Sequence, residues 1–89
     1  MKCDKPKALF DSFYPNPSRG NLSFVFNEAI NKNLKIRFLN ALGRVIVERN
    51  YKMDNTTFLH VENLDLQGVF MVEILLDGEV LKTERVVFL

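Results

Sequence analysis

The chain has 89 residues, of which 47% are hydrophobic and 26% are charged. This composition is too apolar for disorder, and the length is enough for one small domain but not for two domains or a deep catalytic cleft. Twelve Lys and Arg residues and eleven Asp and Glu residues leave a net charge of +1. The charges are mixed along the sequence, which argues against a basic nucleic-acid-binding stripe.

Residues 1–8 are charged and contain Pro6, so they predict a loose N-terminal segment or a non-native start. Residues 9–89 are expected to form the domain. No apolar run has the length of a secretory signal or a membrane helix. The chain is therefore expected either to stay in the cytoplasm or to be the excised end of a longer exported protein. Its single cysteine, Cys3, cannot form an internal disulfide.

About seven stretches have the length, β-prone composition and period-two alternation of strands. In chain order they are residues 9–14, 22–26, 34–38, 44–49, 57–61, 68–76 and 79–89. The clearest one places Leu34, Ile36 and Phe38 on a single face, which predicts that they point inward. Lys35 and Arg37 alternate with them and are expected in solvent.

The segments between these stretches carry turn residues. Pro15 to Gly20 predicts a tight turn, because each proline lacks an N–H and restrains the residue before it. Asn40 to Gly43 and Asp77-Gly78 predict hairpin turns. Residues 27–33 and 50–56 are expected to be polar loops. Because no helical period persists, the pattern predicts an all-β, immunoglobulin-like antiparallel sandwich of about seven strands.

Residues that could carry chemistry are sparse. The four glycines lie too far apart for a dinucleotide fingerprint or a P-loop, and one His and one Cys cannot supply a zinc site. His60 lies within a predicted strand, and no serine stands in a nucleophile elbow. We therefore interpret His60 as a surface or hydrogen-bonded structural residue, and we expect no enzyme activity, no metal and no cofactor.

Four groups of residues resemble the C-terminal sorting domains of type IX secretion in Bacteroidetes, also called Por secretion tails. They are Tyr14-Pro15-Asn16-Pro17 with Gly20; Leu34 to Val45 with Gly43 and Arg44 at its turn; Leu64 with Gly68 and Phe70; and Lys82 with Glu84-Arg85-Val86-Val87. The resemblance covers about residues 12–89, in the order and spacing of the family. Phe70 stands where the family often has Tyr, and Phe88-Leu89 stands where a terminal Lys is frequent.

The resemblance implies a domain that directs a cargo protein, fused on its N-terminal side, through the outer-membrane translocon. The cargo would pass through the periplasm and then be secreted or attached to the cell surface, after a surface sortase removes the domain. Neither nucleic acid binding nor membrane insertion is implied.

Residues 79–89 are the candidate recognition segment, because a strand at a sheet edge can offer unpaired N–H and C=O groups to a partner strand. The candidate contacts are Lys82, Arg85, Val86 and Val87. The alternative is that the apolar residues of this strand only fill the core. Likewise, the Pro15–Gly20 segment either contacts the translocon or only fixes how the chain enters the sandwich.

Two other functions are compatible with a small β-sandwich, since fold alone does not decide function. One is an immunoglobulin-like binding or adhesion module of a surface protein, for which Tyr51 is the one candidate aromatic for a glycan site. The other is a free-standing cytoplasmic interaction protein.

Overall fold

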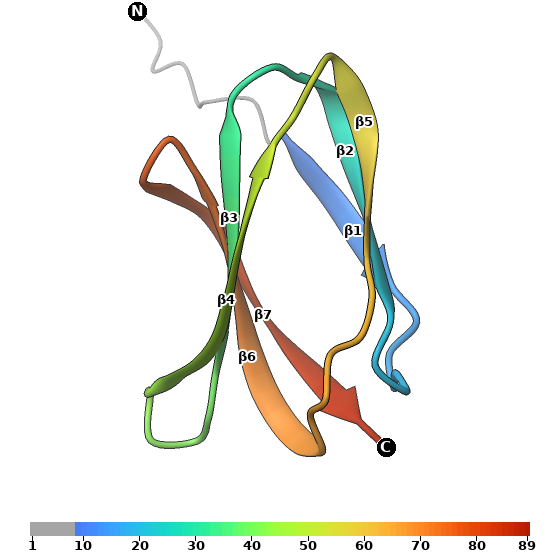
Figure 1. The fold of residues 1–89 in the computed structure, drawn as a ribbon, viewed down its shortest axis with the longest axis vertical. Helices are drawn as coiled ribbons and strands as arrows, with labels where there is room; N and C mark the ends of the chain where they lie inside the picture. The colour runs from blue at the N-terminus through green and yellow to red at the C-terminus, as the bar shows by residue number, and fades with distance from the viewer. Residues whose placement is uncertain (1–8) are drawn as a thin grey trace, which may run out of the picture.

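The computed structural model describes residues 9–89, so the expectations for residues 1–8, Cys3 among them, lie outside the described part. Its strands are β1 (Phe10–Tyr14), β2 (Leu22–Ile30), β3 (Asn33–Leu39), β4 (Val45–Lys52), β5 (Thr56–Val61), β6 (Gly68–Leu76) and β7 (Glu79–Phe88). They form two antiparallel sheets, in the orders β1-β2-β5 and β4-β3-β6-β7. The sheets face each other as two layers (Figure 1). The predicted all-β sandwich is confirmed.

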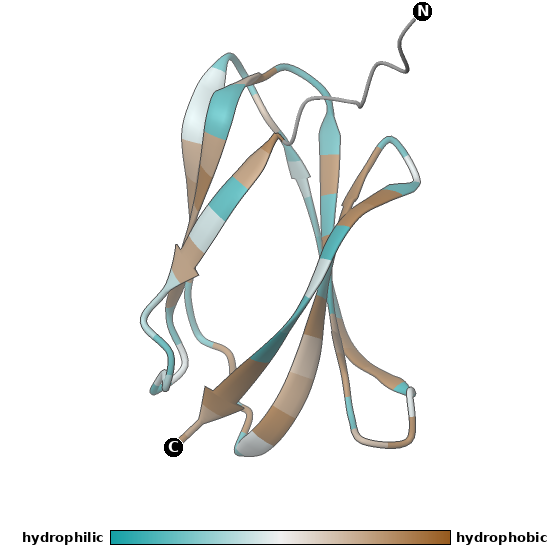
Figure 2. Cartoon of the chain, turned by 180° about the vertical axis from the view of Figure 1, so that it is seen from behind, coloured by the Kyte–Doolittle hydropathy of each residue, from teal (hydrophilic) through white to brown (hydrophobic). Residues whose placement is uncertain are grey.

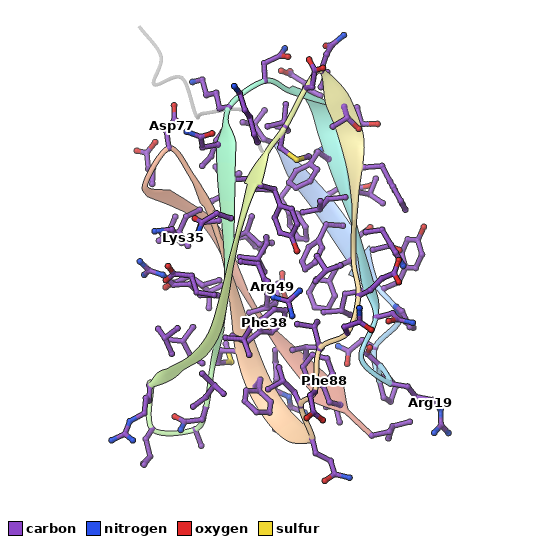
Figure 3. All side chains as sticks on the ribbon, viewed as in Figure 1. Arg19, Lys35, Phe38, Arg49, Asp77 and Phe88 are labelled. Atoms are coloured by element: carbon purple, nitrogen blue, oxygen red, sulfur yellow. The ribbon has the colours of Figure 1, made fainter. Side chains whose placement is uncertain are left out.

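The core follows from the period-two alternation. Leu34, Ile36 and Phe38 of β3 have no exposed surface. Lys35, between them, points away from the sandwich (Figure 3). Phe38 packs edge to face against Phe88 of β7, with ring centroids 5.8 Å apart. Each such side chain contributes about 1.5–3 kcal/mol when fully buried, so this row is a main source of stability.

The expected polar loop at residues 27–33 is wrong. β2 continues to Ile30, whose side chain is 3% exposed, and only two residues connect it to β3. The register of β2 against β5 shifts between Val25 and Ile30. Such an irregularity breaks the alternation of apolar and polar residues along a strand, and this hides the continuing strand from a periodicity argument.

The expected polar loop at residues 50–56 is also shorter than predicted, because β4 runs to Lys52 and β5 begins at Thr56. β4 is an edge strand in which no residue is fully buried. Its polar residues therefore lie in strand conformation without a burial cost, and polarity alone does not mark where it ends.

Both predicted hairpin turns are confirmed. Asp77 and Gly78 have φ angles of 50° and 85°, the positive values that a two-residue type I′ turn requires. In the β3–β4 turn the Asn40 side-chain oxygen accepts hydrogen bonds from the backbone N–H of Leu42 at 2.9 Å and of Arg44 at 3.0 Å. These bonds hold the turn that brings β4 back along β3.

Candidate functional site

β7 lies at the edge of the four-stranded sheet and pairs along its length with β6. Val86 and Phe88 face the core, with 0% and 2% of their surface exposed. Arg85 and Val87 alternate with them and point to the outer face of the sheet. The recognition candidates therefore differ in accessibility. Val86 is fully buried, whereas Arg85 and Val87 have exposed surface that a partner could contact.

The segment between β1 and β2 covers the free edge of β7 near its end. The Asn16 side-chain oxygen accepts a hydrogen bond from Val87 N at 3.0 Å, and its nitrogen donates one to Arg85 O at 3.1 Å. Ser18 N donates to Val87 O and Ser18 O accepts from Leu89 N, both at 2.8 Å. The outward-facing groups Arg85 O, Val87 N and Val87 O are therefore already paired.

Ser18 and Gly20 hold this covering segment in place. Ser18 has no exposed surface, and its hydroxyl donates to Asn21 O and accepts from Gly20 N at 3.1 Å. Gly20 has a φ of 115°, and a Cβ there would lie 2.8 Å from Leu64 O. In return, Gly20 O accepts a hydrogen bond from Leu64 N at 2.9 Å. Glycine is required here both for its backbone conformation and for the close approach of Leu64.

The first half of β7 is open but carries charges on its inner side. Lys82 and Glu84 stand opposite Ile74 and Val72, two core residues of β6. Their side chains therefore leave the strand on the inner face of the sheet. At the flank of the sandwich they form an ion pair at 3.4 Å. The N–H and C=O of Thr83 face outward by the alternation of the ladder, and no described residue pairs with them.

His60 lies on the outer face of the three-stranded sheet. Its Nδ1 is 3.0 Å from the Ser23 hydroxyl, and its Nε2 is 3.6 Å from a carboxylate oxygen of Glu62. The interpretation of His60 as a hydrogen-bonded residue is confirmed. Within residues 9–89, no group of three or more His, Cys, Asp and Glu side chains could hold a metal ion. Nor does this part of the chain contain a helix long and apolar enough to cross a membrane.

The family model of the secretion system C-terminal sorting domain, Por_Secre_tail, matches residues 12–88. The chain belongs to this family. The resemblance inferred from the four groups of residues is thereby confirmed. The family is one of sorting signals of type IX secretion, not a catalytic family, and its members belong to secreted or cell-surface proteins. No curated protein and no solved structure gave a significant match.

The structure brings most motif residues of this sorting domain to one end of the sandwich. Asn16 and Ser18 contact the end of β7, and Gly20 contacts Leu64. At the start of β6, the half-buried Phe70 ring packs edge to face on Phe88 at 5.8 Å.

The remaining motif residues lie at turns, at strand ends and in one groove. Gly43 and Phe70 line one groove on the outer face of the four-stranded sheet, and Gly68, with a φ of 101°, begins β6. Pro15 and Pro17 flank Asn16, and both of their preceding peptide bonds are cis. Tyr14 ends β1 with 51% of its surface exposed. Arg44 is exposed beside the β3–β4 turn.

Sequence reasoning missed a residue that links the two sheets. Arg49 points from β4 across the sandwich toward the connection between β5 and β6 (Figure 3). Its guanidinium donates to Glu62 O at 3.2 Å and to Asn63 O at 3.3 Å. The sequence did contain a signal for this contact, because an arginine at an inward position of a predicted strand needs a polar partner. Tyr51, the glycan candidate, also packs against the core, and so does not form an exposed platform.

Proposed function

We propose that this sorting domain carries a cargo protein, fused on its N-terminal side, through the outer-membrane translocon, and that a surface sortase then removes the domain. The observation that carries the proposal is the family match over residues 12–88. The arrangement of the motif residues supports it, since Asn16 and the segment held by Gly20 cover the end of β7, the strand that carries the recognition candidates.

We assign the direct contacts to Arg85 and Val87, which lie on the outer face of β7. Val86 supports recognition indirectly, because it is fully buried and helps to hold the strand in the sheet. Lys82 is engaged with Glu84 at the flank and has a protective role at the strand edge.

The Pro15–Gly20 segment has a positioning role in this proposal. The polar groups of Asn16 and Ser18 are occupied by the backbone of β7, so they are not free for the translocon. Their contribution is to keep the end of β7 paired and in a fixed position.

The proposal is tested with a reporter protein that has its own signal peptide and carries residues 9–89 at its C-terminus. In a bacterium with a type IX system, we expect the reporter at the cell surface or in the medium. A reporter lacking residues 80–89 should stay in the periplasm, because both recognition residues and the sheet edge are lost. Cell fractionation and immunoblotting measure the distribution.

A strain lacking the translocon is the control, and there the complete reporter should also stay in the periplasm. Arg85→Glu provides a milder variant, since an exposed charge reversal leaves the core intact. Export of the complete reporter without the translocon, or normal export after removal of residues 80–89, would contradict the proposal.

A further inference from the structure

The outer face of the four-stranded sheet has a polar half, in which the carboxylates of Glu48 and Glu73 are paired. Arg37 of β3 lies between two acidic residues of its neighbouring strands. Its guanidinium is 3.1 Å from Glu48 of β4 and 3.3 Å from Glu73 of β6. Lys35 adds a second contact to Glu48 at 3.7 Å. Both carboxylates are therefore already neutralised by groups of this chain.

The other half of the same face, toward the β3–β4 turn, is apolar. Its residues come from all four strands, and we call them the outer apolar patch: Leu39, Val45, Val69, Met71 and Val87. Leu39 stands opposite both Val45 and Met71, and Val69 stands opposite Val87, so the patch is continuous across the sheet. Figure 2 shows apolar residues gathered in this lower part of the sheet.

The patch is exposed and hollowed. Val69 is 54% exposed and Val45 is 42% exposed, although both are strongly hydrophobic. A groove of about 380 Å³ runs between the β3–β4 turn and β6, lined by Leu39, Ala41, Val69 and Met71 among others. Contiguous apolar surface of this kind on a small domain marks a site of interaction.

Two unpaired cations border the patch. Arg44 precedes Val45 at one side, and Arg85 stands opposite Met71 at the other. Neither guanidinium forms an ion pair within the described residues. A second copy docked through its own patch would bring further arginines, and the nearest carboxylates on that face, Glu48 and Glu73, are already paired with Arg37. Charge complementarity therefore favours a partner that carries acidic residues.

We propose that the outer apolar patch docks a protein of the export machinery that presents an apolar segment flanked by carboxylates. The segment fills the groove, and the carboxylates meet Arg44 and Arg85. A protein fits better than a lipid surface, because anionic membranes are typically bound by clusters of about 4–8 basic residues. This inference rests on the proposed function and adds to it the location and chemistry of the contact.

Export of the reporter carrying residues 9–89 tests the patch. Val69→Asp places a charge in the groove and Arg85→Glu reverses a bordering charge, and each should reduce export about tenfold or more, as at a central interface residue. The matched controls are Lys32→Glu, in the connection between β2 and β3, and Lys52→Glu, at the end of β4; both lie at the end of the sandwich opposite the β3–β4 turn (Figure 1). Both should be exported like the unchanged chain.

Site-specific crosslinking gives a second readout in the same cells. A photoreactive phenylalanine analogue at position 45 should crosslink to a translocon component, and this product should disappear when Arg85→Glu is added. The same analogue at position 50, on the polar half of β4, should give no such product. Equal crosslinking from both positions, or none from position 45, would overturn the inference.

The outcomes separate the inference from the function on which it rests. If the unchanged chain fails to export the reporter, the proposed function fails. If it succeeds and both patch variants are exported equally well, only the patch assignment fails. Thermal unfolding of the purified variants shows whether they fold. If Val69→Asp does not fold, Arg85→Glu still tests the patch.

Two further measurements exclude the other occupants. Sedimentation of the purified domain should show a monomer, and a dimer that Val69→Asp dissociates would overturn the proposal in favour of a second copy. Vesicles containing anionic phospholipid should not bind the domain. Binding to them that Arg85→Glu abolishes would overturn it in favour of a lipid surface.

Discussion

Asn16 performs at the edge of β7 the task that a backbone peptide group performs inside a sheet. Its carboxamide accepts a hydrogen bond from Val87 N and donates one to Arg85 O, so one side chain pairs with both a backbone donor and a backbone acceptor. The prolines on either side of it supply no N–H of their own. A side-chain amide followed by Ser18 therefore provides the donor and acceptor pattern that this proline-rich segment would otherwise lack.

Asn16→Ala should lower the free energy of unfolding by about 0.5–1.5 kcal/mol, because two hydrogen bonds are lost at a site that water can reach. Urea denaturation measures the change, and amide hydrogen exchange should become faster at Val87. Asn50→Ala is the matched control, since Asn50 is exposed on β4 and forms no side-chain hydrogen bond with the described residues. An unchanged exchange rate at Val87 would show that the carboxamide does not hold this edge.

At the scale of the element, β7 is an edge strand protected in two different ways. Residues 16–18 cover the outward backbone groups near its end. Nearer its start, no residue of the described part pairs with the outward backbone groups of Thr83, and there Lys82 and Glu84 put charge on the inner side of the strand. Inward charges discourage another strand from adding to an edge, since pairing would bury them. This explains how a domain with an open edge can avoid pairing with its own copies.

Lys82→Val should promote self-association, because it removes one inward charge and raises the β-propensity of the open half of β7. Light scattering over time at high protein concentration, or sedimentation velocity, measures the effect. Arg19→Val removes the same charge from a turn and should leave the domain monomeric. If both variants associate to the same extent, net charge and not the strand edge is responsible.

For the whole molecule, stability depends on a single core shared by two small sheets. Phe38 of β3 is fully buried against Phe88 of β7, whereas Phe58 of β5 is 46% exposed on an outer face. A domain of this size has a total stability of about 5–15 kcal/mol, so one large cavity removes a substantial part of it.

Phe38→Ala should cost about 3–5 kcal/mol, because it leaves a cavity between the layers. Phe58→Ala removes the same ring from the surface and should cost about 1 kcal/mol or less. Urea denaturation followed by circular dichroism compares the two. Similar losses for both variants would contradict the burial pattern on which the sandwich depends.

The strands and hairpins were predictable because they depend on neighbours along the chain. The alternation from Leu34 to Phe38 and the Asp77-Gly78 turn are local signals, and both were interpreted correctly. The full length of β2 was not predictable, since its register shift interrupts the alternation. The length of β4 was missed for a different reason, because an edge strand can be polar on both faces and still pair.

Local periodicity was thus enough to predict the fold class, and the four motif groups were enough to predict the family. The chain alone did not reveal that Asn16 pairs with Val87, 71 positions away, or that Arg37 neutralises the two acids beside the outer apolar patch. Which strands become neighbours depends on how two sheets bury one common core, a balance over the whole chain. Only the tertiary structure therefore shows which polar groups already have partners within the described residues. The outer apolar patch and the two arginines beside it could be recognised only on that basis.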